Sequence, residues 1–246
     1  MDEQILASRI RDAIRLKNTT DVFKSVGFLS ESEIAKVRLL PDLKEQKYTF
    51  FGGYEEAERC FFVSLPDWCD SAEDIGIIKA FTFTYRKCDK LAHKDFLGTF
   101  MALGITRESI GDILCEEGRT IAFFSENVSK YVANQIEKVG GVGVSVSEGF
   151  DYPLPVTATL KEFTDTVASL RLDSVVSALI GTSREKAKEI ILDKRVLVNS
   201  LVVDKVTFFV PDNAKISIRG QGRFLLSEAF ETTKKGRIIL KYFKYV

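Results

Sequence analysis

The residues best suited to acid–base chemistry are His93, Lys94 and Asp95, which are consecutive in the chain. A histidine close to a carboxylate can move protons near neutral pH. If these residues open a helix, however, adjacent side chains point about 100° apart, and the sequence fixes no nucleophile near them. We therefore interpret His93 and Asp95 as polar residues of a first helical turn, with a catalytic role as the less favoured alternative.

Other chemical signatures are incomplete. Ser183 and Lys186 fit S-x-x-K, but the partner motifs of that chemistry are absent, and a serine there is better explained as a helix start. The glycines at 140, 141 and 143 lack the third glycine of a dinucleotide loop, because Val146 stands in its place. His93 is the single histidine, and the four cysteines contain no C-x-x-C pair. The sequence predicts no catalytic residue, no metal and no cofactor.

The charges indicate a different kind of function. The 246 residues carry 35 Lys+Arg and 35 Asp+Glu, but residues 1–168 hold 20 against 27, a balance of −7, and residues 169–246 hold 15 against 8, a balance of +7. A basic module attached to an acidic body is typical of proteins that bind a polyanion. Neutral net charge therefore does not exclude a nucleic-acid partner.

The basic third begins with a predicted helix from about Thr182 to Asp193, opened by a capping-box spacing. At 100° per residue, Arg184 and Lys188 fall along one edge of its apolar stripe, and the acidic residues gather on the other side. This sorting predicts a cationic edge for phosphate, and the alternative is an ordinary solvated face.

Beyond the helix we expect a small sheet. Asn199 and Ser200 form the predicted tip of a hairpin, and further strands are predicted over 206–210, 215–219, 223–226 and 237–243. Additional basic candidates for RNA contact lie in this region: Lys194, Arg195, Lys205, Lys215, Arg219 and Arg223.

The upstream elements predict an α+β protein. We expect a mostly helical α/β region over 1–72, a β-α-β-β-α-β domain of ferredoxin-like, RRM-like type over 73–150, a linker over 151–168 and the basic module over 169–246. Phe81 and Phe83 share a strand face and could stack bases or belong to the core. No segment approaches a membrane span or a signal peptide, so we expect a cytoplasmic protein with no membrane partner.

The basic module resembles the S4 RNA-binding domain. The matching segments are Arg171-Leu172-Asp173, Ser183-Arg184, Val196-Leu197-Val198-Asn199 and Arg219-Gly220-Gln221-Gly222-Arg223-Phe224. The resemblance implies two helices laid against structured RNA, with Arg171, Ser183, Arg184, Lys188, Arg195 and Asn199 near the contact. The family usually has glycine where Lys194 and Ser200 stand, so we expect strain at Ser200 or a shifted helix end at Lys194.

The whole chain resembles the YlmH family of bacterial S4 proteins. The resemblance rests on His93 to Gly98, Leu103-Gly104-Ile105, Arg107 to Leu114, and Phe51-Gly52-Gly53-Tyr54 with Ala57-Glu58-Arg59. It implies a non-enzymatic, monomeric factor that binds ribosomal RNA on stalled large subunits, with tRNA as a further partner, in ribosome-associated quality control. The motif residues His93, Lys94, Asp95, Arg107 and Asp112 are left without a role. The alternative function is an RNA-modifying enzyme that docks through its S4 domain.

Overall fold

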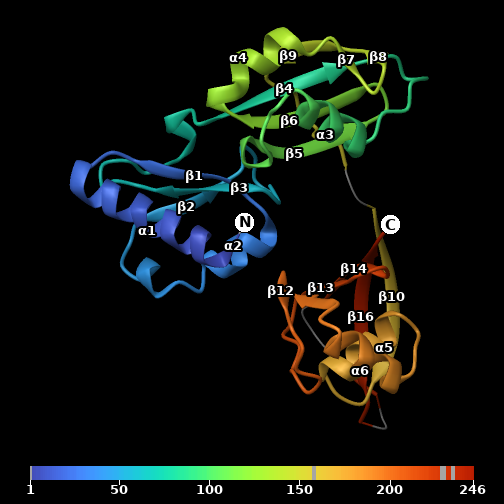
Figure 1. The fold of residues 1–246 in the computed structure, drawn as a ribbon. Helices are drawn as coiled ribbons and strands as arrows, with labels where there is room; N and C mark the ends of the chain where they lie inside the picture. Colours follow the sequence, from blue (N-terminus) through green and yellow to red (C-terminus); the bar gives the residue numbers. More distant parts are fainter. Residues whose placement is uncertain (1, 157–158, 228–230, 234–235) are drawn as a thin grey trace. The chain divides into compact units, whose positions relative to one another are not determined.

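The computed structural model describes residues 2–156, 159–227, 231–233 and 236–246. They form two compact units, Met1–Thr157 and Ala158–Val246 (Figure 1). Both units combine helices with antiparallel sheets, which confirms the predicted α+β class.

The first part of unit one is a three-stranded sheet of order β1-β3-β2 with helices packed on it. Leu6, Ile10 and Ile14 of the first helix share a core with Val26 and Phe62 of the sheet. The predicted capping box is confirmed, because the Ser30 hydroxyl accepts the Glu33 N–H and Glu33 accepts the Ser30 N–H. The elements are α1 (Glu3–Thr20), β1 (Lys24–Leu29), α2 (Glu31–Val37), the 3₁₀ helix η1 (Pro41–Leu43), β2 (Tyr48–Phe51) and β3 (Cys60–Ser64).

The second part of unit one has the predicted β-α-β-β-α-β order. Its sheet runs β5-β6-β4-β9, with the first and third strands in the centre, as a ferredoxin-like fold requires. The elements are η2 (Glu73–Ile75), β4 (Ile78–Thr84), α3 (His93–Ala102), η3 (Arg107–Ser109), β5 (Ile110–Glu116), β6 (Arg119–Ser125), α4 (Glu126–Gln135), β7 (Lys138–Val139), β8 (Val142–Gly143) and β9 (Ser145–Glu148).

Both faces of this central sheet are used for packing. Phe81 and Phe83 lie in the core shared with α3 and α4, so they are core residues and not base-stacking platforms. On the opposite face, Phe123 packs in one cluster with Phe28 and Phe61 of the N-terminal sheet. The N-terminal sheet therefore covers the middle of the face that an RRM leaves open for RNA.

Unit two is one sheet with two helices on one face. Its strands run β10-β16-β14-β13-β11-β12, and β15 also pairs with β16. Figure 1 shows α5 and α6 together beside β10 and β16, and buried side chains of both helices share one core with the sheet. The elements are β10 (Leu160–Val167), α5 (Leu172–Leu179), α6 (Arg184–Leu192), β11 (Val196–Val198), β12 (Leu201–Val202), β13 (Lys215–Ile218), β14 (Gly222–Leu226), β15 (Glu231–Thr232) and β16 (Ile238–Tyr245).

Two sequence interpretations of this unit need correction. The linker predicted over 151–168 contains β10, which pairs with β16 along eight residues. Most β10 side chains are exposed, so this strand lacks the apolar alternation that would reveal it. The strand predicted over 206–210 is replaced by turns and one isolated bridge between Phe209 and Arg171, because this segment bonds to the start of α5.

Candidate nucleic-acid interface

The centre of the candidate interface is a buried carboxylate that holds two arginines. The Asp173 side chain, on the first turn of α5, is 0% exposed. Its Oδ1 accepts a hydrogen bond of 3.1 Å from Arg171 Nε, and its Oδ2 accepts one of 2.6 Å from an Arg184 terminal nitrogen. The Arg171 and Arg184 side chains are 35% and 51% exposed, so each contacts the carboxylate and is also partly open to solvent.

Asp173 is ionised because the two arginines outweigh its burial. Burial alone raises its pKa, but the hydrogen bonds from Arg171 and Arg184 and their positive charges lower it below the ordinary value. Asp173 Oδ1 also accepts the backbone N–H of Ser174. The carboxylate therefore fixes the position of both guanidinium groups before any ligand binds.

A pocket of about 360 Å³ lies at this arginine pair, lined by Ser169, Arg171, Asp173, Arg184, Glu185 and Lys188. Arg184 and Lys188 thus do share one surface, as the helical spacing predicted. The charge sorting is incomplete, however, because Lys188 Nζ lies 2.7 Å from Glu185 and Lys186 Nζ lies 2.7 Å from Glu189. Residues three apart on a helix are neighbours, which lets these acidic side chains reach across.

Ser183 is the N-cap of α6 and stands one residue after Thr182, where the capping-box spacing placed the cap. Its hydroxyl accepts the Lys186 N–H at 3.2 Å, so it serves the helix terminus. Arg195 lies farther along and donates to the Arg219 backbone oxygen at 2.9 Å. Lys205 is exposed, and Lys215 and Arg223 are partly buried in the sheet.

The two positions where glycine was expected both have left-handed backbone. Lys194 has φ 57° after the end of α6, and Asn199 and Ser200 have φ 48° and 66° at the hairpin tip. Asn199 Oδ1 accepts the Lys215 N–H at 2.9 Å, which ties the tip to β13. The helix end is therefore not shifted, and strain is present at both non-glycine positions.

In unit one, Asp112 explains part of the unassigned motif. Its carboxylate accepts hydrogen bonds from the Tyr54 hydroxyl at 2.8 Å and from the backbone N–H groups of Glu58 and Arg59 at 2.7 and 3.2 Å. Tyr54 also stacks on Phe123, with ring centroids 4.9 Å apart. These contacts join the N-terminal segment to β5 and β6, so Asp112 has a structural role.

Arg59 makes the same connection from the opposite direction. Its Nε donates to the Ile110 backbone oxygen, and one terminal nitrogen donates to the backbone oxygens of Phe28 and Arg107, all at 2.8 to 3.0 Å. Burial, and next the positive charge of Arg107, lowers the pKa of Arg59 to about 10, so it stays cationic at neutral pH. Arg107 itself donates to the Ile110 oxygen at 3.0 Å. Arg59 therefore holds the junction between the two sheets, and the Arg107 side chain holds the local backbone at the start of β5.

The remaining motif residues stand at the start of α3. Asp95 Oδ2 accepts the Ala92 N–H at 2.9 Å, so this carboxylate caps the helix and is not directed at His93. Desolvation, and next the positive charge of Arg107, lowers the pKa of His93. His93 and Lys94 are exposed. Among the described residues, no three His, Cys, Asp or Glu side chains converge as a metal site requires.

Comparisons with known proteins agree with this geometry. Residues 73–150 match a family model described as "Putative RNA-binding domain in YlmH", and residues 170–216 match the S4 domain. The chain is also 29% identical over 238 residues to the "Ribosome-associated protein quality control protein P2" of Bacillus subtilis, covering 96% of this chain and 93% of that protein. The resemblance to the YlmH family is confirmed.

A solved structure supports the YlmH fold. The "Cell division protein ylmH from Streptococcus pneumoniae" superposes with a TM-score of 0.53 at 16% identity, covering 60% of this chain and 90% of that chain. Within the part of the chain that the structure describes, no helix has the length and apolarity to cross a membrane.

Two features of the C-terminal unit were not predicted as site residues. Asp173 was noted only as part of the S4 resemblance, although it positions both arginines. Phe209 is 69% exposed, and its backbone bridges to Arg171. An exposed ring on a segment paired with Arg171 can stack on an unpaired base. In the sequence, the adjacent aromatic residues Phe208 and Phe209 were the available signal for this exposed ring, but both fell within the strand predicted over 206–210.

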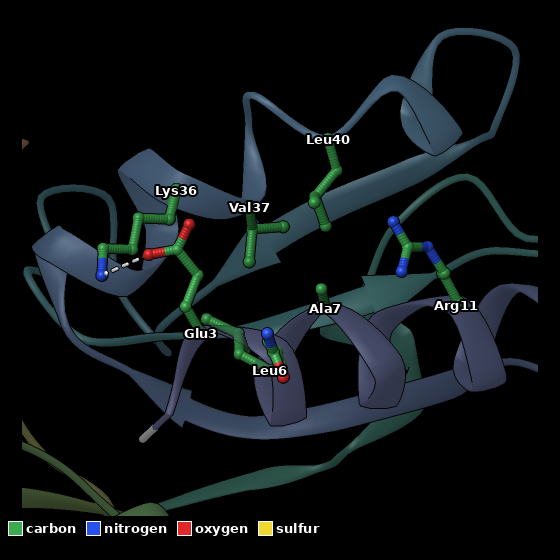
Figure 2. Close-up of a pocket in the computed structure, with 8 residues that line it drawn as sticks. Glu3, Leu6, Ala7, Arg11, Lys36, Val37 and Leu40 are labelled. Atoms are coloured by element: carbon green, nitrogen blue, oxygen red, sulfur yellow. Dashed lines mark ion pairs between the residues drawn. The ribbon is translucent and has the colours of Figure 1, made fainter.

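The N-terminal region also has a surface groove, shown in Figure 2, of about 450 Å³ between α1 and α2. Leu6, Val37 and Leu40 contribute its apolar lining. The Lys36–Glu3 ion pair of 3.0 Å, drawn as a dashed line, spans it, and Arg11 is paired with Asp42. Its charges are thus neutralised locally, and no predicted site residue lines it.

Proposed function

We propose that the protein binds structured ribosomal RNA on the large ribosomal subunit through the surface formed by Arg171, Arg184 and Lys188. In this proposal it acts as a cytoplasmic monomer without a cofactor, in quality control of stalled complexes that still carry peptidyl-tRNA. The observation that carries the proposal is the buried Asp173 carboxylate, which holds the guanidinium groups of two partly exposed arginine side chains in place.

Preorganised arginines suit a phosphate ligand for two reasons. A guanidinium presents several N–H donors in a plane, which matches phosphate oxygens better than a lysine does. Holding the side chains in advance also reduces the entropy lost on binding. Lys188 and the exposed Phe209 extend the surface to a second phosphate and an unpaired base.

The ribosomal partner is supported by the name of the Bacillus subtilis relative, which describes a ribosome-associated quality control protein. The absence of chemistry is supported by Asp95 and Asp112, since both carboxylates of the motif are committed to backbone N–H groups. Of the other motif residues, Arg107 donates to backbone oxygens, and the exposed Lys94 is a cation that can contact tRNA or rRNA.

Sucrose-gradient fractionation of a cell extract at two salt concentrations tests the proposal. We expect the protein to sediment with the large subunit at low salt and to be released at high salt, because each neutralised phosphate releases a counterion. About four to six phosphate contacts would make this salt dependence steep. Protein that stays at the top of the gradient at both salt concentrations would contradict the proposal.

A further inference from the structure

Phe209 is an aromatic side chain that the fold of unit two turns outward. Its two chain neighbours point the other way, since Phe208 packs against the core of the unit and Val210 is 3% exposed. Successive side chains of an extended segment point to opposite sides, so the backbone that buries these neighbours exposes the ring between them. Phe209 is 69% exposed, and no other aromatic side chain in the described part of unit two is exposed.

The backbone of Phe209 pairs with that of Arg171, the residue before α5. Two hydrogen bonds between neighbouring residues flank this antiparallel bridge. They join the Val210 N–H to the Leu170 oxygen at 2.9 Å and the Leu172 N–H to the Phe208 oxygen at 2.8 Å. Residues paired in this way have Cα atoms about 4.5 Å apart and side chains on the same side. The ring and the Arg171 side chain therefore leave the backbone side by side.

The same segment also supports the buried carboxylate of the arginine pair. The Val206 oxygen accepts the Asp173 N–H at 3.3 Å. Asp173 in turn holds Arg171 and Arg184, and both arginines line the pocket proposed for phosphate. Backbone contacts thus connect the segment that carries the ring to the phosphate pocket. The spacing between a base on the ring and a phosphate in the pocket is therefore set before RNA binds.

The faces of the Phe209 ring are open to a ligand. Within the described residues, no other ring stacks on it and no cation lies over it, whereas the Arg223 guanidinium lies 4.9 Å from the Tyr245 ring centroid. An open aromatic face beside a phosphate-binding arginine matches the two parts of a nucleotide, its base and its phosphate. An apolar protein surface over the ring would also cover the net positive charge of the arginine pair, which costs desolvation energy.

Only an unpaired base can reach this ring. The bases of an A-form duplex are stacked on one another, whereas those of loops and bulges can be splayed onto aromatic side chains. We propose that the Arg171–Arg184 surface recognises an RNA hairpin loop or bulge, with an unpaired base stacked on Phe209 and the adjacent phosphate on Arg171. The inference rests on the proposed function and deepens it, because it names the class of structured RNA and makes Phe209 the residue that determines specificity.

The test measures fluorescence anisotropy of two labelled RNAs with the full chain. One is a hairpin with an unpaired loop, and the other is a blunt duplex with the sequence of the hairpin stem. Phe209→Ala removes the ring, and Phe209→Tyr keeps a ring at the same position. Val202→Ala is the matched control, because it shortens another exposed apolar side chain of unit two, on β12.

We expect Phe209→Ala to bind the hairpin at least about five-fold more weakly than wild type does, the lower limit for losing one stacked base. Its duplex affinity should stay within about two-fold, which also shows that the variant is folded. Phe209→Tyr and Val202→Ala should stay within about two-fold of wild type for both RNAs. Arg184→Ala with Lys188→Ala should weaken the binding of both RNAs, because each presents phosphates.

Unchanged hairpin affinity of Phe209→Ala, or an equal loss for hairpin and duplex, would overturn the inference. The proposed function would survive that result if the Arg184→Ala, Lys188→Ala double variant still lost hairpin affinity. If the wild-type protein bound neither RNA, the proposed function itself would be contradicted. A wild-type dimer in sedimentation that Phe209→Ala dissociates would show that the ring joins two copies of the chain, and the inference would also be overturned.

Discussion

Arg184 donates a hydrogen bond of 2.6 Å to Asp173, whose carboxylate has no exposed surface. Such a contact costs desolvation energy that an exposed ion pair avoids. Arg171 binds the same carboxylate, so two positive charges meet one negative charge and a net positive charge remains. This relationship connects the packing of α5 with the chemistry of the surface.

Replacing Asp173 with asparagine should destabilise unit two and weaken RNA binding. The amide keeps the shape but loses the charge that holds both guanidinium groups, and we expect a loss of about 1–3 kcal/mol in unfolding free energy. Urea denaturation measures it. Glu185→Gln is the matched control, because Glu185 is an exposed partner of Lys188 and should cost at most about 1 kcal/mol. Equal effects of the two substitutions would contradict the role given to Asp173.

The pH dependence of stability should carry the signature of Asp173. Its pKa in the folded protein is lowered, so its contribution is fully present above the unfolded pKa of about 3.9 and is lost as pH falls through the folded pKa. We expect the stability difference between wild type and Asp173→Asn to shrink as pH falls below about 4. Denaturation series from neutral pH into acid measure this difference, and one that is constant with pH would refute the assignment.

Asp112→Asn should destabilise unit one by about 1–3 kcal/mol, because the amide NH₂ group cannot accept the N–H groups of Glu58 and Arg59. Tyr54→Phe removes a single hydrogen bond to the same carboxylate and should cost about 0.5–1.5 kcal/mol. Thermal unfolding followed by the fluorescence of the single tryptophan, Trp68, reports on this unit. A larger loss for Tyr54→Phe than for Asp112→Asn would be inconsistent with the network.

Local patterns in the sequence predicted the local structure well. The Ser30 capping box, the Asn199–Ser200 hairpin tip and the β-α-β-β-α-β order depend on neighbouring residues and were confirmed. By contrast, β10 and the covering of the central sheet depend on distant partners. The pairing of β10 with β16 joins residues about eighty positions apart, which no periodicity within β10 could indicate.

The site shows the same division. Helical spacing correctly placed Arg184 beside Lys188, and the same spacing also puts Glu185, three residues away, within reach of Lys188, a contact that the predicted charge sorting overlooked. The role of Asp173 depends on the packing of α5 against α6, and the structural role of Asp112 depends on the junction of two sheets. Both carboxylates are polar residues whose partners are supplied by tertiary structure.

Ser200→Gly should stabilise unit two by about 0.5–1 kcal/mol. A left-handed conformation costs a non-glycine residue roughly 1–2 kcal/mol, and part of that gain is offset by the greater freedom of glycine in the unfolded chain. Ser200→Ala keeps the left-handed strain and serves as the control. Chemical denaturation of both variants checks this expectation, and a destabilised glycine variant would show that the serine side chain compensates for its backbone.

The most direct test of the central claim is the affinity of Arg184→Ala with Lys188→Ala for a ribosomal RNA hairpin, compared with Lys186→Ala. All three side chains lie on α6, but Lys186 is outside the pocket and is paired with Glu189. We predict that the double variant loses at least about ten-fold in affinity with a smaller salt dependence, while Lys186→Ala stays within about two-fold of wild type. Equal affinities of the double variant and wild type would contradict the assignment of this surface to RNA.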